Sequence, residues 1–347
     1  MSTETAAPSG APVAASESGP VLEVEDLVVQ YPIPRGLMGA LRRRPRRTVR
    51  AVEGVSLSVN RGEMLALVGE SGCGKTTTAQ AVLRLVQAQS GSIRFEGRDI
   101  TGLAPRQLRP LRRRMQLIYQ DPYESLDPRF RVSQTIEEPL LVHGIKGTQE
   151  ERDRRIAEAL TRAGLTPPEL YAGRYPHELS GGQRQRVAVA ASLVLDPTLL
   201  VADEPVSMLD VSVRAGVLSL LDGLRKSGLG ILMITHDLST AAHYADRIAV
   251  MYLGRIVEEG PAREVIDHPQ HPYTKALLSV VPPRDPRDRR TPQILQGETP
   301  DAVRIPSGCR FHPRCPMAEE RCKVEDPLLH IPKEARTENH RAACLLV

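Results

Sequence analysis

Residues 64–77 have the sequence MLALVGESGCGKTT, and this stretch decides how the chain folds. Its first five residues are apolar, which is typical of a buried strand, and the residues from position 76 onward favour a helix. Between them, Gly69, Gly74, Lys75 and Thr76 match the pattern G-x-x-x-x-G-K-[ST]. A strand, a glycine-rich loop and a helix start in this order predict a phosphate-binding P-loop.

A P-loop suits an anion because consecutive backbone amides and a helix N-terminus point at the same place. We therefore expect the phosphates of a nucleotide, with Lys75 on the outer phosphates and the hydroxyl of Thr76 on Mg²⁺. Cys73 is interpreted as a small loop residue rather than a nucleophile, although its place at a helix start could lower the pKa of its thiol. The loop residues predicted to bind the nucleotide are Gly69, Ser71, Gly72, Cys73, Gly74, Lys75, Thr76 and Thr77.

The chain has 347 residues, which allows one large α/β domain with appendages. It has no tryptophan and only 3% aromatic residues, which argues against stacking surfaces for single-stranded nucleic acid, so no nucleic-acid partner is expected. No apolar run approaches the ~20 residues that span a membrane. Residues 1–20 lack the apolar segment of an export signal and are predicted to form a disordered tail of a cytoplasmic protein. Arginines crowd residues 42–50, where a solvated loop is favoured over contact with lipid headgroups or an acidic partner.

Three segments alternate apolar and polar residues like half-buried strands: 21–31 and 51–59 before the P-loop, and 91–97 after it. They predict an antiparallel sheet layer. Tyr31, at the end of the first segment, is either an aromatic that stacks on a purine ring or an ordinary strand tyrosine, and the sequence alone favours neither.

Residues 134–176 are predicted to form a mainly helical insert, because apolar residues from Ile156 to Ala163 recur at helical spacing. The insert leads into LSGGQRQR, where Ser180, Gly181 and Gly182 open another helix. This glycine-rich helix start is a second potential anion site. One nucleotide rarely needs two such sites from one chain.

Polar residues follow three apolar strands further along the chain. Asp203 and Glu204 come at the end of one of these strands, where open α/β sheets bind ligands. Asp203 suits a magnesium shell, and Glu204 suits orienting or activating a water for in-line attack. His236, after the next strand, could contact a γ-phosphate or the attacking water, or be a capped or core histidine. Gln120 can reach a metal or a water but is weak evidence by itself.

In this order the motifs resemble the nucleotide-binding subunit of an ATP-binding cassette (ABC) transporter. The matching motifs are GESGCGKTT for Walker A, Gln120 for the Q-loop, LSGGQRQR for the family signature, LLVADEP for Walker B, SMLD for the D-loop and His236 for the H-loop. Met208 departs from the family, in which alanine is more common. Within the family, YQDPYESLDPR, HPYTKALL and CRFHPRCP resemble the ATPases of oligopeptide, dipeptide and nickel importers.

The resemblance implies an α/β P-loop NTPase fold. The ABC cassette would cover residues 21–262, with a RecA-like core, an antiparallel β subdomain and a helical subdomain at about residues 121–185. An extension of the type found in oligopeptide importers, with a cysteine-containing tail, would cover residues 263–347.

The resemblance also implies a head-to-tail dimer, in which Ser180, Gly181, Gly182 and Gln183 of one subunit close over ATP bound by the other. Gln120, Glu204 and His236 become the implied catalytic residues, and Gln120 joins Thr76 and Asp203 around Mg²⁺. The implied partners are a second, homologous ATPase, two transmembrane permease subunits and an extracytoplasmic substrate-binding protein. The expected place is the cytoplasmic face of the cell membrane.

The expected function is therefore to bind and hydrolyse ATP and so energise an importer of dipeptides or oligopeptides. A nickel or glutathione importer and a soluble ABC ATPase acting on nucleic acid or ribosomes are the alternatives. A plain P-loop kinase leaves LSGGQ unexplained.

Four of the five cysteines lie near the end of the chain, at Cys309, Cys315, Cys322 and Cys344. Disulfides are not expected in a reducing compartment, which leaves a metal site or idle thiols. The five, six and twenty-one intervening residues depart from zinc-ribbon spacing, so a structural [4Fe-4S] cluster is predicted, with Zn²⁺ as the alternative and His312 as a possible substitute ligand. CRFHPRCP also resembles the cysteine tail of peptide-importer ATPases.

Overall fold

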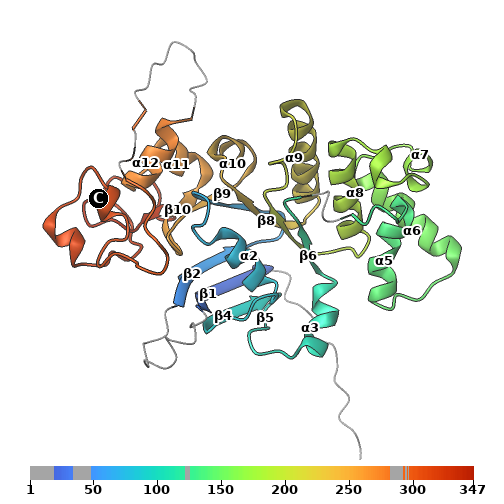
Figure 1. The fold of residues 1–347 in the computed structure, drawn as a ribbon, viewed down its shortest axis with the longest axis horizontal. Helices are drawn as coiled ribbons and strands as arrows, with labels where there is room; N and C mark the ends of the chain where they lie inside the picture. Colours follow the sequence, from blue (N-terminus) through green and yellow to red (C-terminus); the bar gives the residue numbers. More distant parts are fainter. Residues whose placement is uncertain (1–18, 34–47, 122–125, 282–291, 294, 296) are drawn as a thin grey trace, which may run out of the picture.

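The computed structural model describes residues 19–33, 48–121, 126–281, 292–293, 295 and 297–347. The tail predicted at residues 1–20 lies outside the described residues as far as position 18, and the arginine-rich segment as far as position 47. Figure 1 shows the strands in the middle, a group of helices in green on one side, and the C-terminal segment in orange and red on the other.

The larger sheet contains the P-loop strand. Its strands within the described residues are β3 (Met64–Val68), β6 (Met115–Ile118), β7 (Leu199–Asp203), β8 (Gly230–Thr235), β9 (Arg247–Tyr252), β10 (Arg255–Pro261) and β11 (Arg341–Ala342). They lie in the order β11-β10-β9-β3-β8-β7-β6. Neighbours are parallel from β9 to β6, and β10 and β11 are added antiparallel. The parallel strands therefore bring the ends of β3, β6, β7 and β8 to one edge.

The smaller sheet is antiparallel and has the order β2-β1-β4-β5. Its strands are β1 (Leu22–Pro32), β2 (Thr48–Val59), β4 (Ser90–Phe95) and β5 (Arg98–Asp99). The predicted antiparallel layer is confirmed, since its three predicted segments correspond to β1, β2 and β4.

Strand β3 lies between two hydrophobic cores, and its side chains alternate between them. Met64, Ala66 and Val68 belong to a core shared with the helices, whereas Leu65 and Leu67 belong to a core shared with the smaller sheet. A strand that is buried on both faces has apolar residues at every position. This explains why the segment before the P-loop is continuously apolar instead of alternating.

Helices surround the larger sheet and form the insert. Helix α2 (Lys75–Val82) follows the P-loop. The insert predicted at residues 134–176 corresponds to α5 (Val132–Val142), α6 (Gln149–Arg162) and α7 (Glu169–Ala172), and α5 and α6 pack on α8 (Gly181–Leu193) (Figure 1). No helix in the described part of the chain is both long enough and apolar enough to cross a membrane. Three other helices precede the C-terminal segment in the described part of the chain: α3 (Pro105–Arg112), α9 (Val211–Lys226) and α10 (Leu238–Tyr244).

The C-terminal segment is attached to the edge of the larger sheet. After α11 (Ala262–Asp267) and α12 (Pro272–Ser279), the chain returns through β11, which pairs with β10. Glu258 in β10 is fully buried, and its carboxylate accepts hydrogen bonds from the backbone N–H of Gln270 (2.7 Å) and His271 (2.9 Å). His340 lies 2.7 Å from the same carboxylate. These contacts satisfy the buried charge and hold the tail on the sheet.

The predicted [4Fe-4S] cluster is wrong. Within the described residues, no group of three or more His, Cys, Asp and Glu side chains could hold a metal ion, which also removes the zinc alternative. Cysteine binds a metal as the thiolate. Burial raises the pKa of the Cys309 thiol to about 11 and also raises the pKa of Cys315 and Cys344, which disfavours that form. All four tail cysteines are free, and Cys322 and Cys344 are buried. They pack as small apolar side chains.

Candidate active site

The P-loop begins at Gly69, directly after β3, and ends at Gly74, which caps α2. A Cβ atom at Gly69 would lie 2.2 Å from the carbonyl oxygen of Met251, and one at Gly74 would lie 2.2 Å from that of Ala51. Both glycines also have positive φ angles, of 155° and 110°. The loop passes so close to the neighbouring backbone that only glycine fits these positions.

Lys75 forms hydrogen bonds with the backbone of its own loop. Its side chain is buried, and Nζ donates hydrogen bonds to the carbonyl oxygens of Gly69 (2.8 Å) and Glu70 (2.9 Å). Carbonyl oxygens carry no net charge, so these bonds leave the positive charge of the ammonium group available to an anion. Ser71 and Gly72 are exposed, and Thr77 is half-buried.

Thr76 and Asp203 place two oxygen ligands side by side. The Thr76 hydroxyl lies 3.3 Å from Asp203 Oδ1, where α2 begins and β7 ends. Asp203 is buried, and this burial, with a smaller contribution from Glu204, raises the pKa of its carboxyl group. A divalent cation would offset the cost of burying the charge. A hydroxyl and a carboxylate are hard oxygen ligands, so the residues present fit Mg²⁺.

Glu204 follows β7 and contacts residues that follow the neighbouring strands β6 and β8. Its carboxylate accepts a hydrogen bond from Gln120 Nε2 at 3.2 Å, and its other oxygen lies 3.1 Å from His236 Nδ1. The backbone of Glu204 has φ of 45°, a left-handed conformation that is uncommon for a non-glycine residue and is often found at functional sites. The Glu204 side chain is 17% exposed and that of His236 is 59% exposed, so the carboxylate is largely shielded while the imidazole faces solvent.

The structure does not bring the second glycine-rich helix start to the P-loop. Figure 1 shows α8 separated from α2 by β6, β8 and α9. Ser180 caps α8: its hydroxyl accepts from Gln183 N at 3.3 Å, and its own N–H donates to Gln183 Oε1 at 3.0 Å. Ser180 is exposed, Gly181 and Gln183 are half-buried, and Gly182 is buried beside Val213 of α9.

Two further residues are predicted to bind the nucleotide, one on a strand of the smaller sheet and one within the P-loop. Tyr31 is in β1, opposite Val49, and its side chain is 37% exposed. Cys73 is buried, and burial raises the pKa of its thiol, although nearby Lys75 acts in the opposite direction. The expectation that the helix start could lower the pKa of Cys73 is therefore wrong, because burial outweighs the nearby positive charge.

Residues of the C-terminal segment also reach the P-loop, and the sequence reasoning missed them. Tyr273, Thr299 and Arg314 contact Glu70 inside the loop. Arg314 is 244 positions away from Glu70 in the chain, and no local pattern links such residues. Position 70 also falls at an unspecified position of the P-loop motif, so the motif gives it no role.

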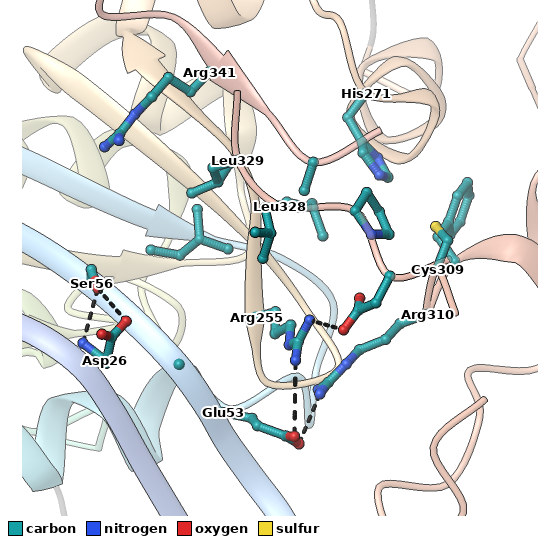
Figure 2. Close-up of a pocket in the computed structure, with 17 residues that line it drawn as sticks. Asp26, Glu53, Ser56, Arg255, His271, Cys309, Arg310, Leu328, Leu329 and Arg341 are labelled. Carbon is teal, nitrogen blue, oxygen red and sulfur yellow. Dashed lines mark hydrogen bonds and ion pairs between the residues drawn. The ribbon is translucent and has the colours of Figure 1, made fainter. Parts of the chain in front are cut away.

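A cavity of about 300 Å³ lies elsewhere, between the C-terminal segment and the strands β1, β2 and β10 (Figure 2). Of the residues predicted to bind a ligand, only Cys309 lines it. Two arginines that line it are paired with carboxylates: Arg310 lies 2.7 Å from Glu53, and Arg255 contacts Asp326. We interpret it as a space left where the tail rests on the sheets.

Comparison with known proteins identifies the family to which the chain belongs. The family model for ABC transporters matches residues 52–207, and the model for the oligopeptide/dipeptide transporter C-terminal region matches residues 257–322. The oligopeptide transport ATP-binding protein AppF of Bacillus subtilis is 44% identical over 94% of this chain and 97% of its own length. The chain belongs to the ABC transporter family.

Other members of the ABC transporter family support the same assignment. The oligopeptide transport ATP-binding protein OppF of Escherichia coli is 42% identical over 94% of this chain and 96% of its own length. A dimeric ATP-binding cassette, MJ0796, solved with bound ADP and phosphate, superposes with a TM-score of 0.60 at 26% identity, over 70% of this chain and 99% of that one. The predicted ABC cassette fold is therefore confirmed.

Proposed function

We propose that this chain is the ATP-binding and ATP-hydrolysing subunit that energises an importer of peptides. The observation that carries the proposal is the convergence of Lys75, Thr76, Asp203 and Glu204 at one sheet edge of an ABC cassette. The cassette is followed by a C-terminal region of the oligopeptide/dipeptide transporter type, and the relatives AppF and OppF are oligopeptide transport proteins.

In the proposed site, the loop amides and Lys75 bind the phosphates of ATP, and Thr76 and Asp203 hold Mg²⁺. When bound, Mg²⁺ neutralises charge that develops on the transferred phosphoryl group. Glu204 orients the attacking water and accepts its proton, while Gln120 and His236 hold the carboxylate in position. Gln120 reaches the magnesium shell through its side-chain oxygen, and Tyr31 stacks on the adenine.

We further propose that a second subunit completes the site. Ser180, Gly181, Gly182 and Gln183 would contact the ATP of that partner, which supplies a role for a helix start that lies away from its own P-loop. Met208 and Val211, beside the site, are 60% and 81% exposed, and such apolar side chains suit a subunit contact. The partner would be a homologous ATPase, and the pair would lie on the cytoplasmic face of the membrane with two permease subunits and an extracytoplasmic binding protein.

The proposed organisation divides the chain between these tasks. Residues 21–262 form the nucleotide-binding cassette, with its helical subdomain at about residues 121–185, and residues 263–347 form the extension. Two separate family models match the chain, one over residues 52–207 and the other over residues 257–322, in support of a division into two parts near this boundary.

The Glu204→Gln variant tests the proposed function in the assembled transporter. Removing the base should slow ATP hydrolysis at least about 100-fold, while ATP binding is retained. Lys75→Ala is the contrasting variant, because it should lose ATP affinity. Hydrolysis rates and equilibrium ATP binding distinguish the two. Near wild-type hydrolysis by Glu204→Gln would show that another group is the base.

A further inference from the structure

Glu70, a P-loop residue, is bound by an arginine from the far end of the chain. Arg314 Nη1 lies 2.8 Å from Glu70 Oε2, and Nη2 lies 3.1 Å from Oε1. This is the two-point geometry in which a guanidinium and a carboxylate match best. The Arg314 side chain is 8% exposed and the Glu70 side chain 26%, so the pair is partly shielded from water and from screening by salt.

Two further residues of the C-terminal segment hold the same loop residue. The Thr299 hydroxyl donates to Glu70 Oε2 at 2.8 Å, and the Glu70 N–H donates to the hydroxyl of Tyr273 at 2.9 Å. Tyr273 is fully buried in α12 and packs against Tyr252 and Phe311. Its hydroxyl is therefore a fixed acceptor for the loop backbone.

The backbone of Glu70 is thus held from two sides. Its carbonyl oxygen accepts from Lys75 Nζ at 2.9 Å, while its N–H is bound by Tyr273 of the C-terminal segment. The Glu70 N–H belongs to the same peptide group as the carbonyl of Gly69, which also accepts from Lys75 Nζ at 2.8 Å. A movement of the segment would therefore displace a peptide group that Lys75 binds. The conformation of the P-loop and the position of Lys75 therefore depend on the position of the C-terminal segment.

The side chain of Glu70 carries a negative charge that needs a positively charged partner. Burial acts to raise the pKa of Glu70, but the hydrogen bonds from Arg314 and Thr299 together outweigh it, so the pKa is lowered and the carboxylate is charged. An unpaired negative charge inside a phosphate-binding loop would repel the phosphates. Arg314 offsets this charge.

We propose that the C-terminal segment is a positioning element of the nucleotide site, in which Arg314, Thr299 and Tyr273 hold Glu70 and so keep the P-loop ready for phosphate. This inference rests on the proposed function, because it assigns a role to residues that act on the same site. Arg314 is a positioning residue, since it acts through Glu70.

Arg310 provides a matched control in the same tail. It is 6% exposed and lies 2.7 Å from Glu53 Oε2, at the cavity between the tail and β2 (Figure 2). Arg310→Gln and Arg314→Gln each remove one ion pair between a buried arginine side chain of the tail and a half-buried glutamate of the cassette. Only Arg314→Gln removes a contact with the P-loop.

The experiment uses the full-length purified chain and measures the Kd for Mg·AMP-PNP, a non-hydrolysable ATP analogue, together with the melting temperature. We expect Arg314→Gln to raise the Kd about tenfold, and Arg310→Gln to leave it within about twofold of wild type while lowering the melting temperature. In the assembled transporter, Arg314→Gln should raise KM for ATP more than it lowers kcat.

Three further variants separate charge from structure. Glu70→Gln combined with Arg314→Gln should recover part of the lost affinity, because the repelling carboxylate is gone. Arg314→Lys should recover less than the wild-type affinity, since lysine keeps the charge but loses the two-point geometry. Thr299→Val is the milder test if Arg314→Gln does not fold, and it should raise the Kd two- to threefold.

An unchanged Kd in Arg314→Gln, or in Thr299→Val where that variant replaces it, would overturn the inference. So would equal increases of Kd in the Arg314 and Arg310 variants, because that result indicates a general loss of structure. Failure of the wild-type chain to bind Mg·AMP-PNP would instead contradict the proposed function, so the two failures are distinguishable.

Discussion

His271 is a buried histidine at the start of α12, where its Nδ1 accepts a hydrogen bond from Tyr273 N at 3.1 Å. Burial lowers its pKa to about 4, although Glu258 acts in the opposite direction. An unfolded chain has a histidine pKa near 6.5. Between these values, the unfolded state takes up a proton that the folded state does not bind, so stability falls as the pH falls from about 6.5 to about 4.

The His271→Asn variant tests this pH dependence, because asparagine keeps an acceptor for the helix start but does not titrate. From pH 7 to pH 4, we expect the free energy of unfolding of the wild type to fall by roughly 3 kcal/mol more than that of the variant. Below about pH 4 both states of the wild type are protonated, and the difference should stop growing. Urea unfolding at each pH gives the two curves, and parallel curves would contradict the assignment.

At the scale of elements, the contact between α8 and α9 depends on a single glycine. A Cβ atom at Gly182 would lie 2.1 Å from Val213 Cγ1, and a valine in a helix has little rotamer freedom with which to move away. The first turn of α8, which carries the family signature, therefore packs directly on α9. Gly182 has a structural task in addition to its proposed contact with ATP.

We expect Gly182→Ala to lower the free energy of unfolding by about 1–3 kcal/mol, because the added methyl group overfills the contact between the helices. Adding Val213→Ala should restore most of this loss. The control is Gly223→Ala on α9, where a Cβ meets nothing within 4 Å and the better helix propensity should add up to about 1 kcal/mol. Urea unfolding measures all of these variants. A Gly182→Ala protein as stable as the Gly223→Ala protein would show that the two helices can separate without cost.

At the scale of the whole molecule, the two glycine-rich helix starts lie on different parts of the chain, α2 and α8 (Figure 1). In the proposed dimer a second subunit would complete the site, and we expect that subunit to be a different, homologous ATPase. Mass measurement of the intact, detergent-purified transporter should find one copy of this chain and one copy of the second ATPase. A transporter with two copies of this chain and no other ATPase would contradict the prediction.

Much of the fold could be predicted from the sequence because the signals are local. The five apolar residues before Gly69, the glycine spacing of the loop and the alternating strands around it all act over a few positions. The placement of Asp203, Glu204 and His236 at strand ends also follows locally, because parallel strands share one carboxyl edge. The sequence could therefore predict which residues meet there, and the structure supplies the contacts of Glu204 with Gln120 and His236.

The tail shows what the sequence by itself could not determine. Four cysteines predicted a metal cluster, but in the tertiary structure they are free thiols, two buried and two half-buried, and the described residues contain no group that could hold a metal ion. Burial and ligand geometry depend on how distant segments pack, and spacing along the chain does not contain that information. For the same reason the contact of Arg314 with Glu70 could not be predicted: it joins positions 244 residues apart, and only folding brings their charges together.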